Sequence, residues 1–224
     1  MDQSVGRQAK RETRVGAAAG CDLLILKIKR SQPAAAPAKE CVVKELFTVK
    51  VDLPQDLFAA IEQVYKPAGM ALTDEVRRER ESGEYCACRF GLDGQVIVFR
   101  VAKTTPTKIG QFVTLWKRPT PASEIAPLDT ADGVAFVVVS VADATHRGQF
   151  VFDRKVLAAK GVMSIDGEGG KRAIRVYPPW VKPVAKQAIR TQQWQLKYFL
   201  ALDQSGSADA VEVRRLFGLN TKPL

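Results

Sequence analysis

Two segments of this 224-residue chain combine basic side chains with tryptophan and contain neither aspartate nor glutamate. They cover residues 94–123 and 169–202, hold twelve lysines and arginines, and include all three tryptophans, Trp116, Trp180 and Trp194. We call them the first and the second acid-free segment. Lysine and arginine bind phosphates, and an indole ring can stack on a nucleobase. Together these residue types indicate chemistry suited to a nucleic acid.

The positive charge of the chain is concentrated in the two acid-free segments. The formal net charge is +10, with 34 lysines and arginines against 24 aspartates and glutamates, so the residues outside these segments sum to −2. A solvated surface ordinarily mixes both signs of charge. A local positive field without carboxylates therefore predicts an anionic partner.

Three neighbourhoods carry the predicted contacts: a loop at residues 103–108, a strand at 172–177 and a helix that begins near Pro183. The loop supplies hydroxyl and ammonium groups around a proline, which suits a phosphate, and aromatic rings suit unpaired bases. The main hypothesis is therefore a protein that binds single-stranded nucleic acid. The residues predicted to contact it are Arg100, Lys103, Thr104, Thr107, Lys108, Lys171, Arg172, Arg175, Tyr177, Trp180, Lys186, Arg190 and Trp194.

The helix predicted over residues 183–202 carries two stripes of side chains. Apolar and small residues recur at about 3.6-residue spacing and are expected to face the core. Lys186, Arg190 and Lys197 form a second stripe, about a hundred degrees around the helix. Trp194 is expected to border this stripe on the side away from the core.

A metal-dependent nuclease is the second hypothesis. Such an enzyme needs clustered carboxylates to hold Mg²⁺ or Mn²⁺, which activates water and stabilises charge on the phosphate. Residues 95–117, where the second and third strands are expected, contain no carboxylate, so Glu84 and Asp93 are the weak catalytic candidates. This distribution favours a binding protein without a metal site or cofactor over an enzyme.

A protein that binds a small anionic ligand is the third hypothesis, because a pocket could use the same cations as a groove. A zinc site is not expected. Cys86 and Cys88 lack the usual two-residue separation of zinc ligands, and His146 is the only histidine. No feature of the sequence indicates an oligomeric state.

The pattern of apolar residues predicts a single α/β (α+β) domain, with a mixed β-sheet flanked by helices. The first three strands are expected to form a meander, and the apolar strand at 133–141 to lie centrally with both faces covered. The expected elements are a helix from about residue 57 to 67, a charged helix over 73–80, strands over 84–90, 95–102, 110–117, 133–141 and 149–153, a helix over 154–160, a strand over 172–177, and helices over 183–202 and 208–217.

The first part of the chain differs in composition from the rest. Residues 1–38 are basic and then rich in alanine and proline, which predicts a disordered arm before a domain over 39–224. The longest uncharged apolar run, 134–142, is far shorter than the about 20 residues that span a bilayer, so no membrane association is expected. The expected location is the cytoplasm, with an organelle as the minor alternative.

Several long motifs of the chain resemble the MepB-like family. The likeness covers roughly residues 53–202 and implies a compact intracellular α/β protein. The order of elements is also similar to that of restriction-endonuclease-like folds, a likeness by analogy alone. The motifs are FRVAKTTPTKIGQFVTLWKR at 99–118, RGQF at 147–150, GKRAIRVYPPW at 170–180, KQAI at 186–189 and QWQ at 193–195.

Overall fold

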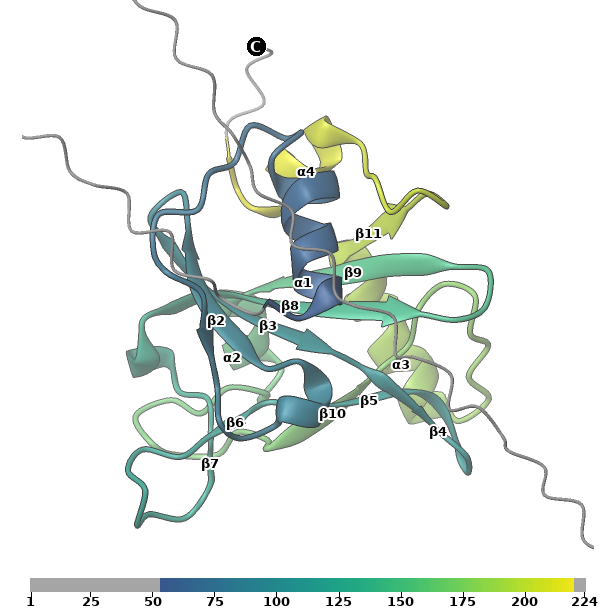
Figure 1. Ribbon diagram of the computed structural model, residues 1–224. Helices are drawn as coiled ribbons and strands as arrows, with labels where there is room; N and C mark the ends of the chain where they lie inside the picture. Colours follow the sequence, from purple (N-terminus) through teal and green to yellow (C-terminus); the bar gives the residue numbers. More distant parts are fainter. Residues whose placement is uncertain (1–52, 220–224) are drawn as a thin grey trace, which may run out of the picture. The chain divides into compact units, whose positions relative to one another are not determined.

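The computed structural model describes residues 53–219, which contain a six-stranded main sheet in the order β1-β2-β3-β8-β9-β11 (Figure 1). Strands β3 and β8 run parallel, and the other neighbours run antiparallel. The expected α/β fold with a mixed sheet is thus confirmed, whereas the predicted arm lies outside the described residues. The strands are β1 (Arg77–Arg78), β2 (Cys88–Leu92), β3 (Gln95–Val101), β8 (Val134–Ala142), β9 (Arg147–Asp153) and β11 (Phe199–Leu202).

The central strands of the main sheet are buried on both faces. Successive side chains of a strand point to opposite faces. Ile97 and Phe99 of β3 therefore enter one core, and Val98 enters the other. In β8, Val138 and Val139 separate in the same way, as predicted for an apolar strand in the middle of the sheet.

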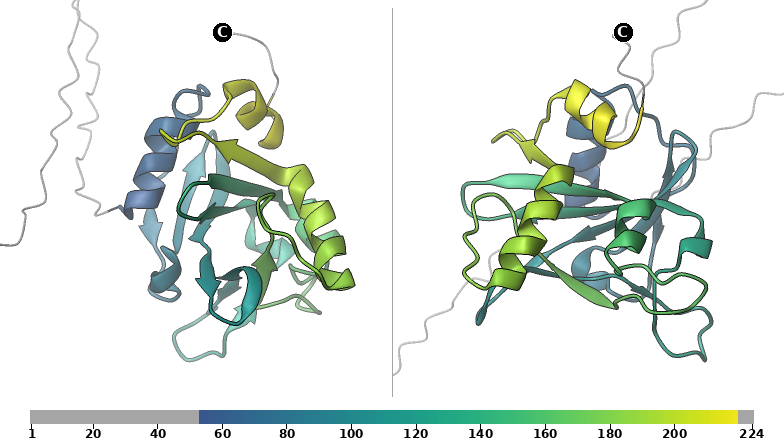
Figure 2. Two further views of the ribbon diagram at one scale, coloured as in Figure 1. Left: turned by 90° about the vertical axis from the view of Figure 1, so that its right-hand side faces the viewer. Right: turned by 180° about the vertical axis from the view of Figure 1, so that it is seen from behind.

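Helices cover both faces of the main sheet, with α1 on one side and α3 on the other in the left view of Figure 2. Helix α1 (Gln55–Ala60) continues into the π-helix η1 (Ile61–Tyr65) and packs beside α4 (Ala210–Leu216). Helix α2 (Arg154–Ala159) covers the opposite face. In the part of the chain that the structure describes, no helix has the length and apolar character needed to cross a bilayer.

A second, three-stranded sheet packs on the α2 side of the main sheet. It has the order β10-β5-β4, from β4 (Lys103–Thr105), β5 (Lys108–Thr114) and β10 (Ala173–Val176). Val113 and Val176 point inward and share the core of Val98. The predicted meander is therefore wrong, because β3 takes β8 as its second neighbour and the chain then leaves the main sheet. We call β10-β5-β4 the small sheet.

The predicted charged helix over residues 73–80 is also wrong. Its C-terminal part forms β1, which pairs with β2 in the register Arg77 to Arg89. Only Val76 is buried within 73–80, so a helix here would have no apolar stripe to pack. The backbone instead lies along the edge of the main sheet.

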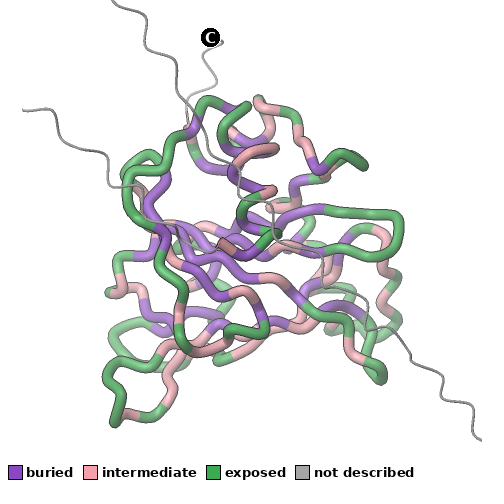
Figure 3. Tube along the Cα trace, viewed as in Figure 1, coloured by how far each residue is buried: buried purple, intermediate pink, exposed green. Residues whose placement is uncertain are grey.

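The long helix predicted over residues 183–202 ends earlier than expected. Helix α3 spans Lys186–Gln195, a 3₁₀ turn η4 follows at Leu196–Tyr198, and the remaining residues form β11. Phe199 pairs with Phe150 of β9, so the sheet gains an edge strand where helical spacing was expected. Figure 3 shows that the buried residues concentrate in the strands of the main sheet.

Phe150 provides a test of the core beneath the small sheet. The side chain is fully buried and its ring stacks on Phe152 with centroids 5.4 Å apart. We expect Phe150→Ala to lower the free energy of unfolding by about 3–5 kcal/mol, because it leaves a cavity. Urea denaturation measures the change. Val211→Ala, at an exposed position of α4, should change stability by at most about 0.5 kcal/mol. Equal losses would contradict this core.

Candidate anion-binding groove

The first acid-free segment is neutralised by carboxylates that come from elsewhere in the sequence. Four of its five cations form ion pairs with acidic residues outside the segment. Its charge is therefore largely balanced within the fold, contrary to the expectation from the sequence. The pairs are Arg100 with Glu79, Lys103 with Glu84, Lys117 with Asp132, and Arg118 with Glu81.

Arg100, predicted to contact nucleic acid, lies in the interior, and that prediction is wrong. Its side chain is 0% exposed, pairs with Glu79 and donates a 2.9 Å hydrogen bond from Nη1 to the carbonyl of Phe99. Arg89 approaches the same carboxylate, with 3.4 Å between its Nε and Oε1 of Glu79. Burial lowers the pKa of Arg100, and the Glu79 carboxylate opposes that shift. One carboxylate thus serves two guanidinium groups.

The second acid-free segment keeps its charge. Across residues 53–219, none of its seven lysines and arginines forms an ion pair. Lys108 of the first segment is likewise without a carboxylate partner among these residues. The positive field predicted from the sequence therefore belongs to the second segment and to Lys108.

A groove of about 710 Å³ opens between α3 and the small sheet. Lys108, Lys160, Lys171 and Arg175 supply its charge, and no acidic residue lines it. Tyr177 and Trp194 supply its aromatic rings. We call it the basic groove, and it brings together five of the thirteen residues predicted to bind. The remaining lining residues are Val162, Ala173, Ile174, Ala185, Gln187, Ala188, Thr191 and Gln195.

Arg175 is held in the groove by neutral groups. Its Nη1 donates to the carbonyl of Lys108 at 3.1 Å and to that of Gly110 at 3.0 Å, and its Nη2 donates to Oγ1 of Thr105 at 2.9 Å. The guanidinium also lies over the ring of Phe112, with its Cζ 5.8 Å from the centroid. These contacts orient the side chain without neutralising it, which is the arrangement that an anion site needs.

Gln195 attaches α3 to the open edge of β10. This fully buried side chain donates from Nε2 to the carbonyl of Arg175 at 2.9 Å, and its Oε1 accepts from the backbone N–H of Tyr177 at 2.9 Å. The amide thereby replaces a neighbouring strand at the sheet edge. Sequence reasoning missed Gln195, because a glutamine within a basic helix reads as a solvated residue.

Tyr177 packs directly over a glycine. Gly110 has φ +83°, and a Cβ atom built there would lie 2.7 Å from the ring of Tyr177. Any other residue would be strained and would push the ring out of the groove. The glycine between Ile109 and Gln111 therefore determines one wall of the site.

Trp194 lies on the inner side of α3, contrary to the predicted position away from the core. Its indole packs on Phe152 with centroids 5.3 Å apart, and the ring is half-buried. Lys160, at the end of α2, places its Nζ 5.9 Å from the centroid of the same ring. Sequence reasoning missed Lys160 because it lies outside both acid-free segments.

The other predicted contact residues surround the groove or lie apart from it. Lys186 and Arg190 are exposed on α3 but do not line the groove, and Arg172 is exposed before β10. Trp180 is covered, because His146 stacks on it with centroids 5.1 Å apart. The rest lie in and around the β4–β5 hairpin, namely Lys103, Thr104 and Thr107.

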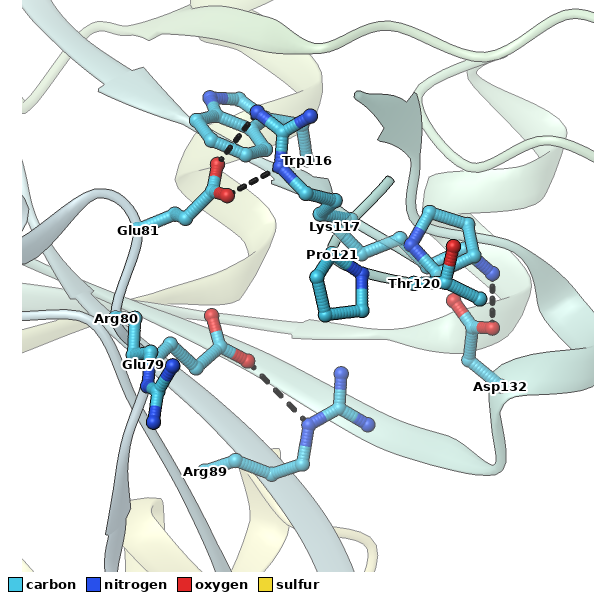
Figure 4. A pocket seen from close by; sticks show the side chains of 11 residues that line it. Glu79, Arg80, Glu81, Arg89, Trp116, Lys117, Thr120, Pro121 and Asp132 are labelled. Carbon is cyan, nitrogen blue, oxygen red and sulfur yellow. Dashed lines mark hydrogen bonds and ion pairs between the residues drawn. The ribbon is translucent and has the colours of Figure 1, made fainter. Parts of the chain in front are cut away.

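A second hollow, of about 670 Å³, lies beside the small sheet and contains both signs of charge (Figure 4). Its walls are residues 79–81 and the chain from Trp116 to Pro121, with β6 (Trp116–Lys117) paired to β7 (Ala126–Pro127) nearby. Glu79, Glu81 and Asp132 line it, each beside a cation. We call it the ion-pair cleft.

The weak catalytic candidates do not come together. Glu84 lies in the 3₁₀ turn η2 (Gly83–Tyr85) before β2, whereas Asp93 follows β2 in the hairpin turn and accepts a 2.9 Å hydrogen bond from the N–H of Ala71. The length of β2 separates the two carboxylates. Within residues 53–219, no three His, Cys, Asp or Glu side chains are grouped so that they could hold a metal ion.

Asp129 connects β7 with residues 162–171, which carry two residues of the basic groove. Its carboxylate accepts from the hydroxyl of Ser164 at 2.6 Å, from the N–H of Gly167 at 2.9 Å and from the N–H of Ala131 at 2.8 Å. These hydrogen bonds lower the pKa of Asp129 to about 2, and the bond from Ser164 has the largest effect. The ionised carboxylate therefore stabilises this wall of the groove.

Comparisons with known proteins agree on one family. The family model described as MepB-like matches residues 79–201 of the chain. A crystal structure of MepB is similar, with a TM-score of 0.54 and 34% sequence identity over 57% of this chain and 85% of the other. A search among curated proteins found no significant match.

The pKa of Asp129 predicts a pH-dependent stability. In the unfolded chain this carboxyl ionises near 3.8, so its contribution is complete above that pH and is lost as the pH falls through about 2. We expect the free energy of unfolding of Asp129→Asn, measured against pH, to fall less steeply over this interval than that of the wild type. Parallel profiles would contradict the assignment.

Glu79 is expected to be essential for stability because of Arg100. Glu79→Gln leaves a buried guanidinium without its counter-charge, so the free energy of unfolding should fall by about 3–5 kcal/mol. Glu75→Gln removes the same charge at an exposed position and serves as the control, with an expected change within about 0.5 kcal/mol. Similar losses in the two variants would refute the structural role of Glu79.

Proposed function

This chain belongs to the MepB-like family, and from the geometry of its basic groove we propose that it binds single-stranded nucleic acid there. One observation carries the proposal: four cations and two aromatic rings share a concave site without a carboxylate. Cations contact the phosphates of a strand, and aromatic rings stack on its bases. The protein would act as a binding protein, in the cytoplasm.

The unpaired charge supports a polyanion as the ligand. Arg175 is oriented by carbonyl and hydroxyl oxygens, so its positive charge remains available to a phosphate. Lys171 and Lys108 likewise have no carboxylate partner among the described residues. Bound counterions would be released when a strand replaces them, which favours binding at low salt.

The position of the aromatic rings favours an unpaired strand over a duplex. Tyr177 and Trp194 are half-buried in the walls of a groove, where they can reach a base that is free to turn out of a stack. Bases in a duplex are already paired and stacked, and their faces are closed to such rings. Stacking of this kind tolerates any base, so we propose binding with little dependence on sequence.

The arrangement of carboxylates supports binding over metal-dependent cleavage. Around the end of β3, the Glu79 carboxylate faces Arg100, and Glu84 faces Lys103 at 3.5 Å. In a metal-dependent nuclease with a restriction-endonuclease-like fold, the neighbourhood at the end of β3 would present acidic groups to a divalent ion. Here cations occupy that neighbourhood, which is the reason for preferring a binding protein.

The salt dependence of binding tests the proposal. Affinity for an oligonucleotide of about 16 nucleotides should fall steeply between about 50 mM and about 200 mM salt. Lys171→Gln should weaken binding severalfold and make the slope of log affinity against log salt shallower by about 0.7, because one phosphate contact is lost. Fluorescence anisotropy at several salt concentrations measures both quantities.

Lys66→Gln is the matched control for this experiment. Lys66 lies after η1, on the face of the main sheet opposite the groove, and its removal changes the net charge equally. Its slope should remain that of the wild type. Equal slopes for Lys171→Gln and the wild type, or equal affinity at low and high salt, would refute the proposal. A nucleoside monophosphate that binds as tightly as the oligonucleotide would support a small-anion site instead.

A further inference from the structure

A short acidic loop covers part of the first acid-free segment. Residues 79–84 contain Glu79, Glu81 and Glu84, and each of these carboxylates pairs with a different cation of that segment. Arg100 in the Glu79 pair is fully buried, whereas both side chains of each of the other two pairs are open to solvent. We call residues 79–84 the acidic loop.

Arg118 has the contacts of a phosphate-binding arginine. Both oxygens of the Glu81 carboxylate accept hydrogen bonds from its guanidinium. Nε donates to Oε1, and Nη2 donates to Oε2 at 3.1 Å. The guanidinium also lies over the indole of Trp116, with its Cζ 5.9 Å from the ring centroid. A carboxylate and a phosphate present two oxygens to arginine in the same bidentate geometry. A phosphate could therefore replace Glu81 at this guanidinium, whose Nη1 also donates to the carbonyl of Ser123.

We propose that the Trp116–Arg118 side of the ion-pair cleft is a second subsite for a phosphodiester of the bound strand, masked in the free protein by Glu81. A strand that enters this subsite would replace the Glu81 carboxylate with a phosphate. Trp116 would lie beside the next base, whereas Lys117 at the same place stays paired with Asp132. This inference rests on the proposed function of the basic groove.

The Glu81–Arg118 pair is exposed enough to be exchanged. The side chains are 36% and 33% exposed, and ion pairs at such positions are weak because water screens them. The backbone of the acidic loop is also unfavourable, since Ser82 has φ +58° and Cys86, just after the loop, has φ +50°. Non-glycine residues rarely adopt this conformation, so a rearrangement of the loop would relieve backbone strain. By contrast, the buried Arg100–Glu79 pair anchors the loop at its start.

The masked subsite and the basic groove flank the same small sheet. Arg175 of the groove is opposite Phe112 in β5, and Trp116 follows four residues later along the chain, about 13 Å away. Between them, Thr114 donates a 3.0 Å hydrogen bond to the hydroxyl of Ser82 in the acidic loop. The loop thus lies on the route from the groove to the subsite.

Removal of the Glu81 charge is the direct test. Glu81→Gln should raise affinity for an oligonucleotide of about 16 nucleotides on the order of threefold to tenfold at low salt. It should also make the salt slope steeper by about 0.7, because one more phosphate is contacted. Glu75→Gln removes an equal charge from an exposed residue outside the loop and should leave the slope unchanged. Anisotropy titrations over a salt series measure both effects.

A double-mutant cycle tests whether Arg118 is the cation that Glu81 masks. In the Arg118→Gln background, Glu81→Gln should raise neither the affinity nor the slope, because the unmasked guanidinium is gone. Thermal unfolding of each variant shows that the fold is kept. The inference would be overturned if Glu81→Gln and Glu75→Gln raised the affinity equally. It would also be overturned if Glu81→Gln raised the affinity as much without Arg118 as with it.

The proposed function and the masked subsite fail in different ways. If the wild type binds with a steep salt slope and Lys171→Gln reduces it, but Glu81→Gln has no effect, the groove stands and the subsite is refuted. If Lys171→Gln has no effect while Glu81→Gln makes the salt slope steeper only when Arg118 is present, the subsite stands and the groove is refuted. If neither variant changes binding, both are refuted.

Discussion

The burial of the main sheet on both faces constrains where this protein can place chemically active side chains. Strands β3, β8 and β9 direct alternate residues into two apolar cores, so a charged side chain there needs a partner within the interior. Arg100 is such a case, and Glu79 supplies its counter-charge. The cations of the basic groove lie instead on and beside the small sheet and at the end of α2, and the groove forms where the small sheet meets α3.

A fully buried amide attaches α3 to β10, and Gln192 adds bonds to the carbonyls of Pro178 and Val181 just beyond that strand. Gln195 bonds the backbone of β10 on both sides of Val176, which places the helix beside an edge strand. Lys171 and Arg175 then face the inner side of α3 across the groove. A helix held only by apolar contacts could slide along the sheet, whereas two directed hydrogen bonds set its register.

Much of the fold could be predicted from local pattern, and the failures share one physical cause. The apolar run of β8 was predicted correctly, because burial on both faces leaves a local signature in the sequence. The errors over residues 73–80 and 199–202 concern segments at the edges of the main sheet. There the pairing with a distant strand decides the conformation, and local spacing does not record that pairing.

The sequence by itself determined that the positive charge is local, that it accompanies tryptophan, and that the chain forms an α/β domain of the MepB-like family. Tertiary structure alone decided which cations are free. The two acid-free segments look equivalent along the chain, yet Glu79, Glu81 and Glu84 fold back onto the first and leave the second unpaired. Charge acts through space over a few ångströms, so a count along the sequence cannot show which carboxylate reaches which cation.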